Sequence, residues 1–197
     1  MKKVIRSNIF ECENNNYKIW GGNQPKYWEI LNSLHSQLTN MLSHHQKVLA
    51  VRLDFHQYEF TQDNQCISLL LKILKKRLKQ HYKINRTGYL WVREIGTQAK
   101  SGQHYHLLLL LNGHIIQHPG KVIKFIEAIC LDRELGFCYT PKNCYYRLKR
   151  GDITQFEKTF YRCSYLAKTA TKGRKQITAN DYSSSRIKKR LIKQHNL

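Results

Sequence analysis

Acidic residues are scarce in this chain: 13 Asp and Glu stand against 34 Lys and Arg, so the formal net charge is +21 over 197 residues. A field of this sign attracts polyanions, above all nucleic acid, and such binding weakens steeply as salt is added. An acidic membrane surface is the competing partner. The charge balance therefore favours a nucleic-acid-binding protein before any motif is considered.

Long apolar runs are also missing. No stretch approaches the roughly 18 to 20 apolar residues of a membrane span, and the N-terminus, Met1 to Asn8, has no apolar signal-peptide core. We therefore expect a cytoplasmic protein with no membrane partner. Hydrophobic residues make up 41% of the chain, enough for one good core, and 197 residues leave little room for a second full domain.

Paired cysteine motifs are absent as well. No Cys-x-x-Cys occurs, and several of the cysteines fall in apolar patterns, so we expect reduced thiols and no structural zinc. The six are Cys12, Cys66, Cys130, Cys138, Cys144 and Cys163.

A predicted β-hairpin from Tyr89 to Asn112 carries the clearest chemical pattern. Its second strand opens with His104 and His106, which share one face because side chains alternate along a strand. The first strand ends near Glu94, ahead of a polar loop from Gly96 to Gly102. If the pairing sets Glu94 opposite His104, the carboxylate lies on the face of the two imidazoles. The three residues would then form a cluster of metal ligands.

A second pattern lies downstream, in a predicted helix that Asp152 or Thr154 caps. Tyr161, Tyr165 and Lys168 stand at i, i+4 and i+7, which places them on one stripe of this helix. The opposite side carries apolar residues that can face the core. The stripe offers a phenol and an ammonium group that could work beside a metal ion.

The remaining periodicities give the order of elements. Helices are predicted from Pro25, from Thr61 or Asp63, and after Pro119-Gly120. Residues 47–56 form a near-continuous apolar stretch, typical of a central strand covered on both faces. Residues 137–139 and 145–148 are either a short strand pair or tyrosine-rich loops.

This order predicts an α+β fold of the split βαβ type, ferredoxin-like or RRM-like, with an antiparallel sheet of four to five strands and helices against one face. The hairpin's second strand would lie centrally, between the first strand and its hairpin partner. Asp54, Glu94, His104 and His106 would then gather at one end of the sheet. We expect an N-terminal arm at 1–24, one domain at 25–172, and a basic tail at 173–197 that is mobile or forms a helix on DNA.

With these residues in place, the sequence resembles the HUH endonucleases, which are named for a His-hydrophobic-His strand and use a catalytic tyrosine. Within them it looks most like the inovirus-type rolling-circle replication initiators (gene II protein-like) and their prophage relatives, including YagK/YfjJ-like proteins. The likeness covers roughly residues 47–172. It lies in Val51 to Asp54, Trp91 to Glu94, His104 to Asn112 and Phe160 to Lys168.

The resemblance implies that His104 and His106 hold Mg²⁺ or Mn²⁺ together with an acidic ligand, which we assign to Glu94, with Asp54 as the alternative. It implies that Tyr165, followed by Lys168, nicks single-stranded DNA at a replication origin through a 5′-phosphotyrosine and can rejoin strands. Tyr161 is then either a packing residue or a second nucleophile. Because no phosphate-loop glycine pattern occurs, we expect no helicase domain of the kind that some relatives carry, and a host helicase and polymerase are the expected partners.

A non-catalytic interpretation stays open. The same sheet could be an RRM-like surface for RNA or DNA, with Tyr89, Trp91 and Tyr105 stacking on bases and the histidines as ordinary surface residues. Other His-x-His enzymes fit less well. A barrel-type metallohydrolase usually needs about 250 residues, and the lack of an acidic residue between His106 and Glu127 removes the spacing of a cupin-like site.

Overall fold

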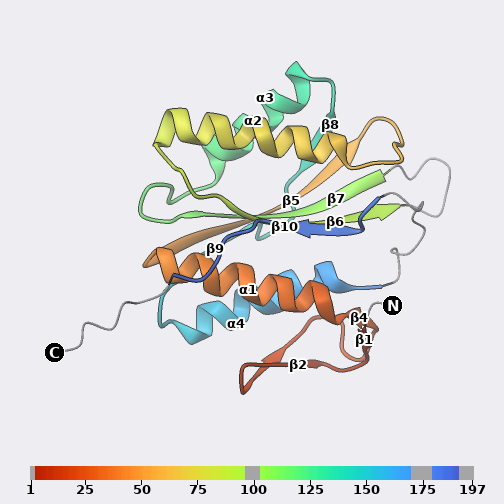
Figure 1. Ribbon diagram of the computed structural model, residues 1–197, viewed down its shortest axis with the longest axis vertical. Helices are drawn as coiled ribbons and strands as arrows, with labels where there is room; N and C mark the ends of the chain where they lie inside the picture. Colours follow the sequence, from red (N-terminus) through yellow and green to blue (C-terminus); the bar gives the residue numbers. More distant parts are fainter. Residues whose placement is uncertain (1–2, 96–102, 170–178, 191–197) are drawn as a thin grey trace.

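The protein is built around an antiparallel sheet that lies between two layers of helices (Figure 1). The computed structural model describes residues 3–95, 103–169 and 179–190, so the predicted loop at 96–102 and the domain boundary at 172 lie outside the described residues. The sheet has six strands in the order β10-β6-β7-β5-β8, with β9 also paired to β5. The α+β fold predicted from the sequence is confirmed.

The sheet strands are β5 (Lys47–Gln57), β6 (Gly88–Ile95), β7 (Gln103–Asn112), β8 (Gly136–Tyr139), β9 (Tyr145–Lys149) and β10 (Tyr182–Ser184). The helices are α1 (Trp28–His44), α2 (Gln65–Tyr82), α3 (Gly120–Asp132) and α4 (Ile153–Cys163), and α4 continues into a 3₁₀ turn, η1 (Ser164–Ala167). Four short strands lie outside the main sheet: β1 (Val4–Ile5), β2 (Ile9–Cys12), β3 (Asn15–Lys18) and β4 (Lys26–Tyr27).

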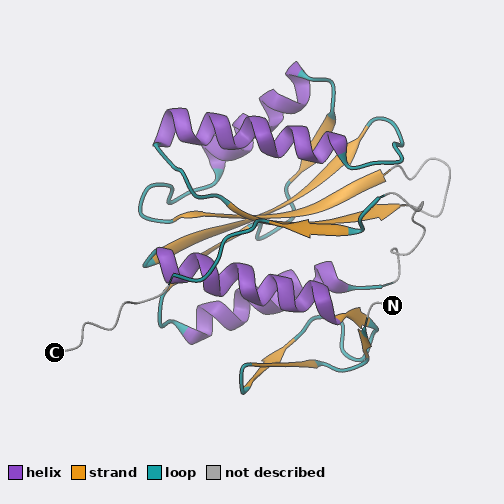
Figure 2. Ribbon diagram, in the orientation of Figure 1, coloured by secondary structure: helices purple, strands orange, loops and turns teal. Residues whose placement is uncertain are grey.

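Helices cover both faces of the sheet, so the prediction of helices on one face is wrong (Figure 2). The reason lies in β7, where successive leucines point to opposite faces of the sheet. Leu107, Leu109 and Leu111 pack in the cluster beneath α2 and α3, whereas Leu108 and Leu110 pack against α1 and α4. All five are at most 1% exposed. Burying one leucine contributes roughly 1.5–3 kcal/mol, so neither face could be left in water.

The central strands pair as predicted. β7 lies between β6 and β5 and runs antiparallel to both. Residues 137–139 and 145–148 are strands rather than loops, but they do not pair with each other. β8 and β9 both bond to β5, one to its last residues and one to its first, as shown by the pairs Phe55–Cys138 and Ala50–Tyr146. The long β5 offers enough backbone groups for both.

The N-terminal residues are part of the fold rather than a separate arm. β2 and β3 form a hairpin whose Phe10 is 1% exposed and stacks on Phe160 of α4, with ring centroids 5.6 Å apart. Ile19 is equally buried in the same cluster. The β2–β3 hairpin therefore covers the outer side of α4.

The described part of the expected basic tail is also built in. Residues 182–184 form β10, which pairs with β6, and residues 185–190 then follow α1. This segment is an edge strand and a packed extension, because its backbone groups find partners on β6 and α1. None of the helices in the described part of the chain has the length and apolarity of a membrane span.

Candidate metal centre and nucleophile

Glu94, His104 and His106 lie together at one end of the sheet. Glu94 pairs directly with His104 across β6 and β7, as the hairpin register predicted. One carboxylate bridges both imidazoles: His104 Nε2 lies 3.5 Å from Glu94 Oε2, and His106 Nε2 lies 3.4 Å from Glu94 Oε1. One potential ligand atom from each residue falls within 4.8 Å of the others. The three donors thus face one ion-sized space.

The burial of this cluster fits a bound cation. Glu94 is 1% exposed and His106 is 5% exposed. His106 Nε2 is buried, and its 3.4 Å approach to Glu94 Oε1 does not meet hydrogen-bond geometry. Such a weak contact leaves hydrogen-bonding capacity of this buried nitrogen unused, and a ligand to the nitrogen would use it. Two imidazoles and a carboxylate are a donor set that divalent cations accept.

Asp54 lies behind His106 rather than in front of it. The two residues pair across β5 and β7, and Asp54 Oδ1 accepts a hydrogen bond from His106 Nδ1 at 2.6 Å. Burial alone would raise the pKa of Asp54, but the hydrogen bond and the charges of His106 and Arg52 hold it below its ordinary value. With its Nδ1 proton fixed on Asp54, His106 presents Nε2 to the cluster. Asp54 thus has the position of a carboxylate that orients a metal-bound histidine, outside the group of Glu94, His104 and His106.

Tyr165 lies beside the cluster, on η1. Its ring centroid is 5.4 Å from that of His106, and Lys168 Nζ donates a hydrogen bond to its hydroxyl. The same ammonium lies 3.2 Å from Glu94 Oε2. The Lys168 ammonium therefore links the phenol to the carboxylate of the Glu94-His104-His106 cluster. The guanidinium of Arg52, 4.8 Å from the ring centroid, holds the phenol from another side.

The predicted helical stripe is not continuous. α4 ends at Cys163, the chain tightens into η1, and Lys168 has an extended backbone with φ −53° and ψ 144°. The Ser164 hydroxyl donates to the carbonyl of Tyr161, a local bond that competes with regular helix geometry. The bend brings Tyr165 and Lys168 to the cluster. Tyr161 stays on the α-helical part, with 38% of its surface exposed.

Trp20 is a site residue that the sequence analysis missed. Its backbone N–H donates to the Ser164 hydroxyl at 2.8 Å, and its ring meets Tyr165 edge-on at 4.8 Å. The N-terminal segment thus helps to fix the phenol. The only signal in the sequence was a lone tryptophan before Gly21-Gly22, which carries no spacing to a partner.

Comparison with known proteins adds one finding. The family model of the YagK/YfjJ C-terminal domain matches residues 10–181. The chain belongs to this family. The matched range includes all five residues that the sequence analysis assigned to the site, and also Trp20 and Asp54. No curated protein and no solved structure gave a significant match.

Exposed aromatic rings border the site of this YagK/YfjJ C-terminal domain. His56 stacks on His104 at 5.1 Å and on Phe137 at 5.0 Å, with interplanar angles of 15° and 5°. Phe137 is 53% exposed, and Tyr139, opposite Asp54 on β8, is 58% exposed. The stack of His104, His56 and Phe137 therefore runs from the candidate metal ligands out to solvent. The sequence analysis missed Phe137 because its pairing with β5 was not predicted.

The aromatic residues of the non-catalytic interpretation lie elsewhere. Tyr105 is fully buried and Trp91 is 5% exposed, both beneath α2, and Tyr89 packs against the same cluster. Burial raises the pKa of Tyr105 to about 12. Trp91 and Tyr105 are too buried to stack on bases, whereas Tyr89 is partly buried, with Lys75 Nζ 4.5 Å from its ring centroid. These three rings therefore do not form one exposed stacking surface.

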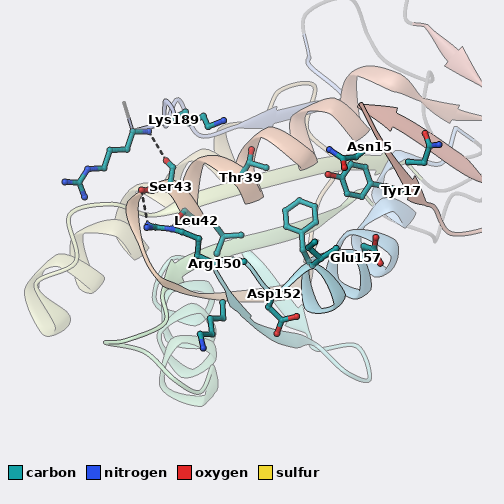
Figure 3. A pocket seen from close by; sticks show the side chains of 15 residues that line it. Asn15, Tyr17, Thr39, Leu42, Ser43, Arg150, Asp152, Glu157 and Lys189 are labelled. Atoms are coloured by element: carbon teal, nitrogen blue, oxygen red, sulfur yellow. Dashed lines mark hydrogen bonds between the residues drawn. The ribbon is translucent and has the colours of Figure 1, made fainter. Parts of the chain in front are cut away.

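A large cavity, about 1140 Å³, is separate from this site (Figure 3). It lies between β3, the end of α1 and the start of α4, and none of the five predicted site residues lines it. Arg150 donates to the carbonyls of Leu42 and Ser43, and Asp152 caps α4 by accepting from Gln155 N. These polar groups hold the helix ends together.

Proposed function

We propose that this YagK/YfjJ C-terminal domain is a metal-dependent endonuclease that nicks single-stranded DNA at a replication origin, with Tyr165 as the nucleophile. One observation carries the proposal: Lys168 contacts both the Tyr165 hydroxyl and Glu94 of the Glu94-His104-His106 cluster. A phenol, an ammonium group and three metal-ligand side chains on one small surface are the groups that phosphodiester cleavage needs. The charge of +21 supports a polyanionic substrate.

Glu94, His104 and His106 would hold Mg²⁺ or Mn²⁺, which when bound polarises the phosphate oxygens. Asp54 keeps His106 turned so that Nε2 faces this position. Glu94 is shared between the metal position and Lys168, so the carboxylate also fixes the ammonium. Glu94 and His106 are thus each held by a second contact with the protein.

Lys168 and Arg52 act on the nucleophile. A phenol has a pKa near 10, so it attacks well only where the phenolate is stabilised, and the ammonium of Lys168 is placed to do this. The Tyr165 oxygen bonds to phosphorus while the bond from phosphorus to the 3′ oxygen breaks. The phenolic proton is lost and the departing oxygen takes up a proton. The products are a 5′-phosphotyrosine and a free 3′-hydroxyl.

A covalent ester suits rolling-circle replication. The ester keeps the energy of the phosphodiester bond, so attack by another 3′-hydroxyl reverses the step and rejoins DNA. Meanwhile a host polymerase extends the free 3′-hydroxyl, with a separate helicase. Hydrolysis by water would end the cycle without a circle.

The deciding experiment compares Tyr165→Phe with Tyr161→Phe on a pool of single-stranded oligonucleotides in Mn²⁺, with mass-spectrometric detection of protein–DNA adducts. We expect adduct formation by the wild type and loss of it in Tyr165→Phe, with DNA affinity unchanged. Tyr161→Phe should still form the adduct. Undiminished cleavage by Tyr165→Phe would refute the assignment, and strand rejoining lost in Tyr161→Phe alone would make Tyr161 a second nucleophile.

A non-catalytic DNA- or RNA-binding protein is the second candidate, favoured by the strong positive charge. It would use a surface other than the buried Trp91 and Tyr105 and the partly buried Tyr89. Wild-type protein that binds the oligonucleotides tightly but never yields an adduct would support this candidate.

A further inference from the structure

A strongly basic groove lies at the other end of β6 from the metal cluster. The groove, about 770 Å³, receives cations from three segments that are distant in the sequence, and none of its lining residues is acidic. They are Lys75, Lys76 and Lys79 in the last turns of α2, Arg86 ahead of β6, and Arg186, Lys188 and Lys189 after β10.

The segment that carries Arg186 and Lys188 is held in place by α1. Three α1 side chains bond its backbone carbonyls: Gln37 to Ser185 at 2.7 Å, Asn40 to Ile187 at 2.8 Å, and His44 to Lys188 at 2.9 Å. Ile187 packs into the core, whereas its two neighbours are exposed. Arg186 and Lys188 therefore present their charges to the groove from a backbone that α1 holds in place.

This arrangement differs from an ordinary solvated helix face. Lysines on one helix are usually spaced among acidic residues, but here like charges from three elements share one concave surface without a carboxylate. Their mutual repulsion is relieved only by anions, and several fixed cations in a row suit a chain of phosphates better than one small ion.

We infer that this groove binds the phosphate backbone of DNA flanking the nicking site, an inference that rests on the proposed function for the identity of its partner. β6 runs from the groove to Glu94. The eight residue steps from Arg86 to Glu94 span about 26 Å at roughly 3.3 Å per step. At 3.4 Å per base pair, this corresponds to about eight base pairs. The groove thus contacts DNA that lies beyond the reach of the metal cluster.

The test uses Lys75→Gln, Lys76→Gln and Lys79→Gln in one protein. The matched control removes three exposed lysines outside the groove, with Lys121→Gln, Lys124→Gln and Lys142→Gln. Affinity is measured by fluorescence anisotropy at several salt concentrations. Each DNA carries a single-stranded segment joined to one duplex arm. The arm has about four base pairs in one DNA and about sixteen in the other, and both DNAs are tested with the arm on each side of the segment.

For the longer arm, we expect the groove variant to lose at least about tenfold in affinity. The slope of log affinity against log salt should fall by about 2 to 3, because each phosphate contact contributes about 0.9. Binding of the shorter arm and adduct formation on it should match the control. Equal losses in the groove and control variants, or equal losses with both arms, would overturn the inference.

Two further outcomes separate the hypotheses. If the wild type forms no adduct, the proposed nuclease fails, but the comparison of arms and variants still decides whether the groove binds DNA. If the groove variant loses binding to phosphatidylglycerol vesicles while its DNA binding is unchanged, the groove is a membrane contact and the inference is wrong.

Discussion

Replacing Asp54 by asparagine tests how the metal position is organised. Asp54 accepts the Nδ1 proton of His106 at 2.6 Å, and His106 Nε2 is the buried atom that faces the cluster. Asparagine keeps the size of the side chain but removes its charge, so the imidazole becomes a weaker and less firmly oriented donor. Loss of such an orienting carboxylate typically lowers metal affinity about 10- to 100-fold, or about 1.4–2.8 kcal/mol.

The assay is calorimetric titration of Mn²⁺ into the protein, with Asp152→Asn as the control. Asp152 also accepts a hydrogen bond, but it caps α4 and lines a separate cavity, so its loss should leave Mn²⁺ affinity unchanged. Unchanged affinity in Asp54→Asn would refute the orienting role. A loss greater than about a thousandfold would instead mean that Asp54 is a direct ligand.

Two more predictions concern cleavage and substrate binding. EDTA should stop DNA cleavage and added Mn²⁺ should restore it, because the cluster aligns no phosphate without its cation; full activity in chelator would exclude Glu94, His104 and His106 as working ligands. Phe137→Ala should weaken binding of single-stranded DNA by about 1–3 kcal/mol in an anisotropy titration, since an exposed ring stacked on His56 can stack on a base. Leu131→Ala, at a position 78% exposed on α3, is the control, and an equal effect of both would rule out stacking at Phe137.

The candidate site could be predicted because it depends on local rules. Alternation along a strand places His104 and His106 on one face, and the hairpin register adds Glu94. The split βαβ order then adds Asp54 from the neighbouring strand. No packing detail was needed for these four residues.

The contacts that the sequence did not reveal are those set by packing between distant segments. Trp20 reaches Tyr165 only because the N-terminal segment packs beside α4, and Phe137 reaches His56 because β8 pairs with the end of β5. The sequence did indicate helices on both faces, because residues 107–111 are all leucine and therefore place apolar side chains on each face of the sheet. At the break after Cys163 the Ser164 hydroxyl bonds to the Tyr161 carbonyl, a contact that periodicity cannot detect.

β10 has a consequence for how copies of this protein behave at high concentration. Without its three residues, β6 would present a free row of backbone donors and acceptors, a template on which another chain could add a strand. Bonds from Ser185 N to Tyr89 O and from Arg93 N to Asp181 O extend this cover in both directions. Arg186 and Lys188 of the basic groove thus follow directly after a short strand that covers the edge of β6. By covering that edge, β10 disfavours intermolecular β-pairing and aggregation.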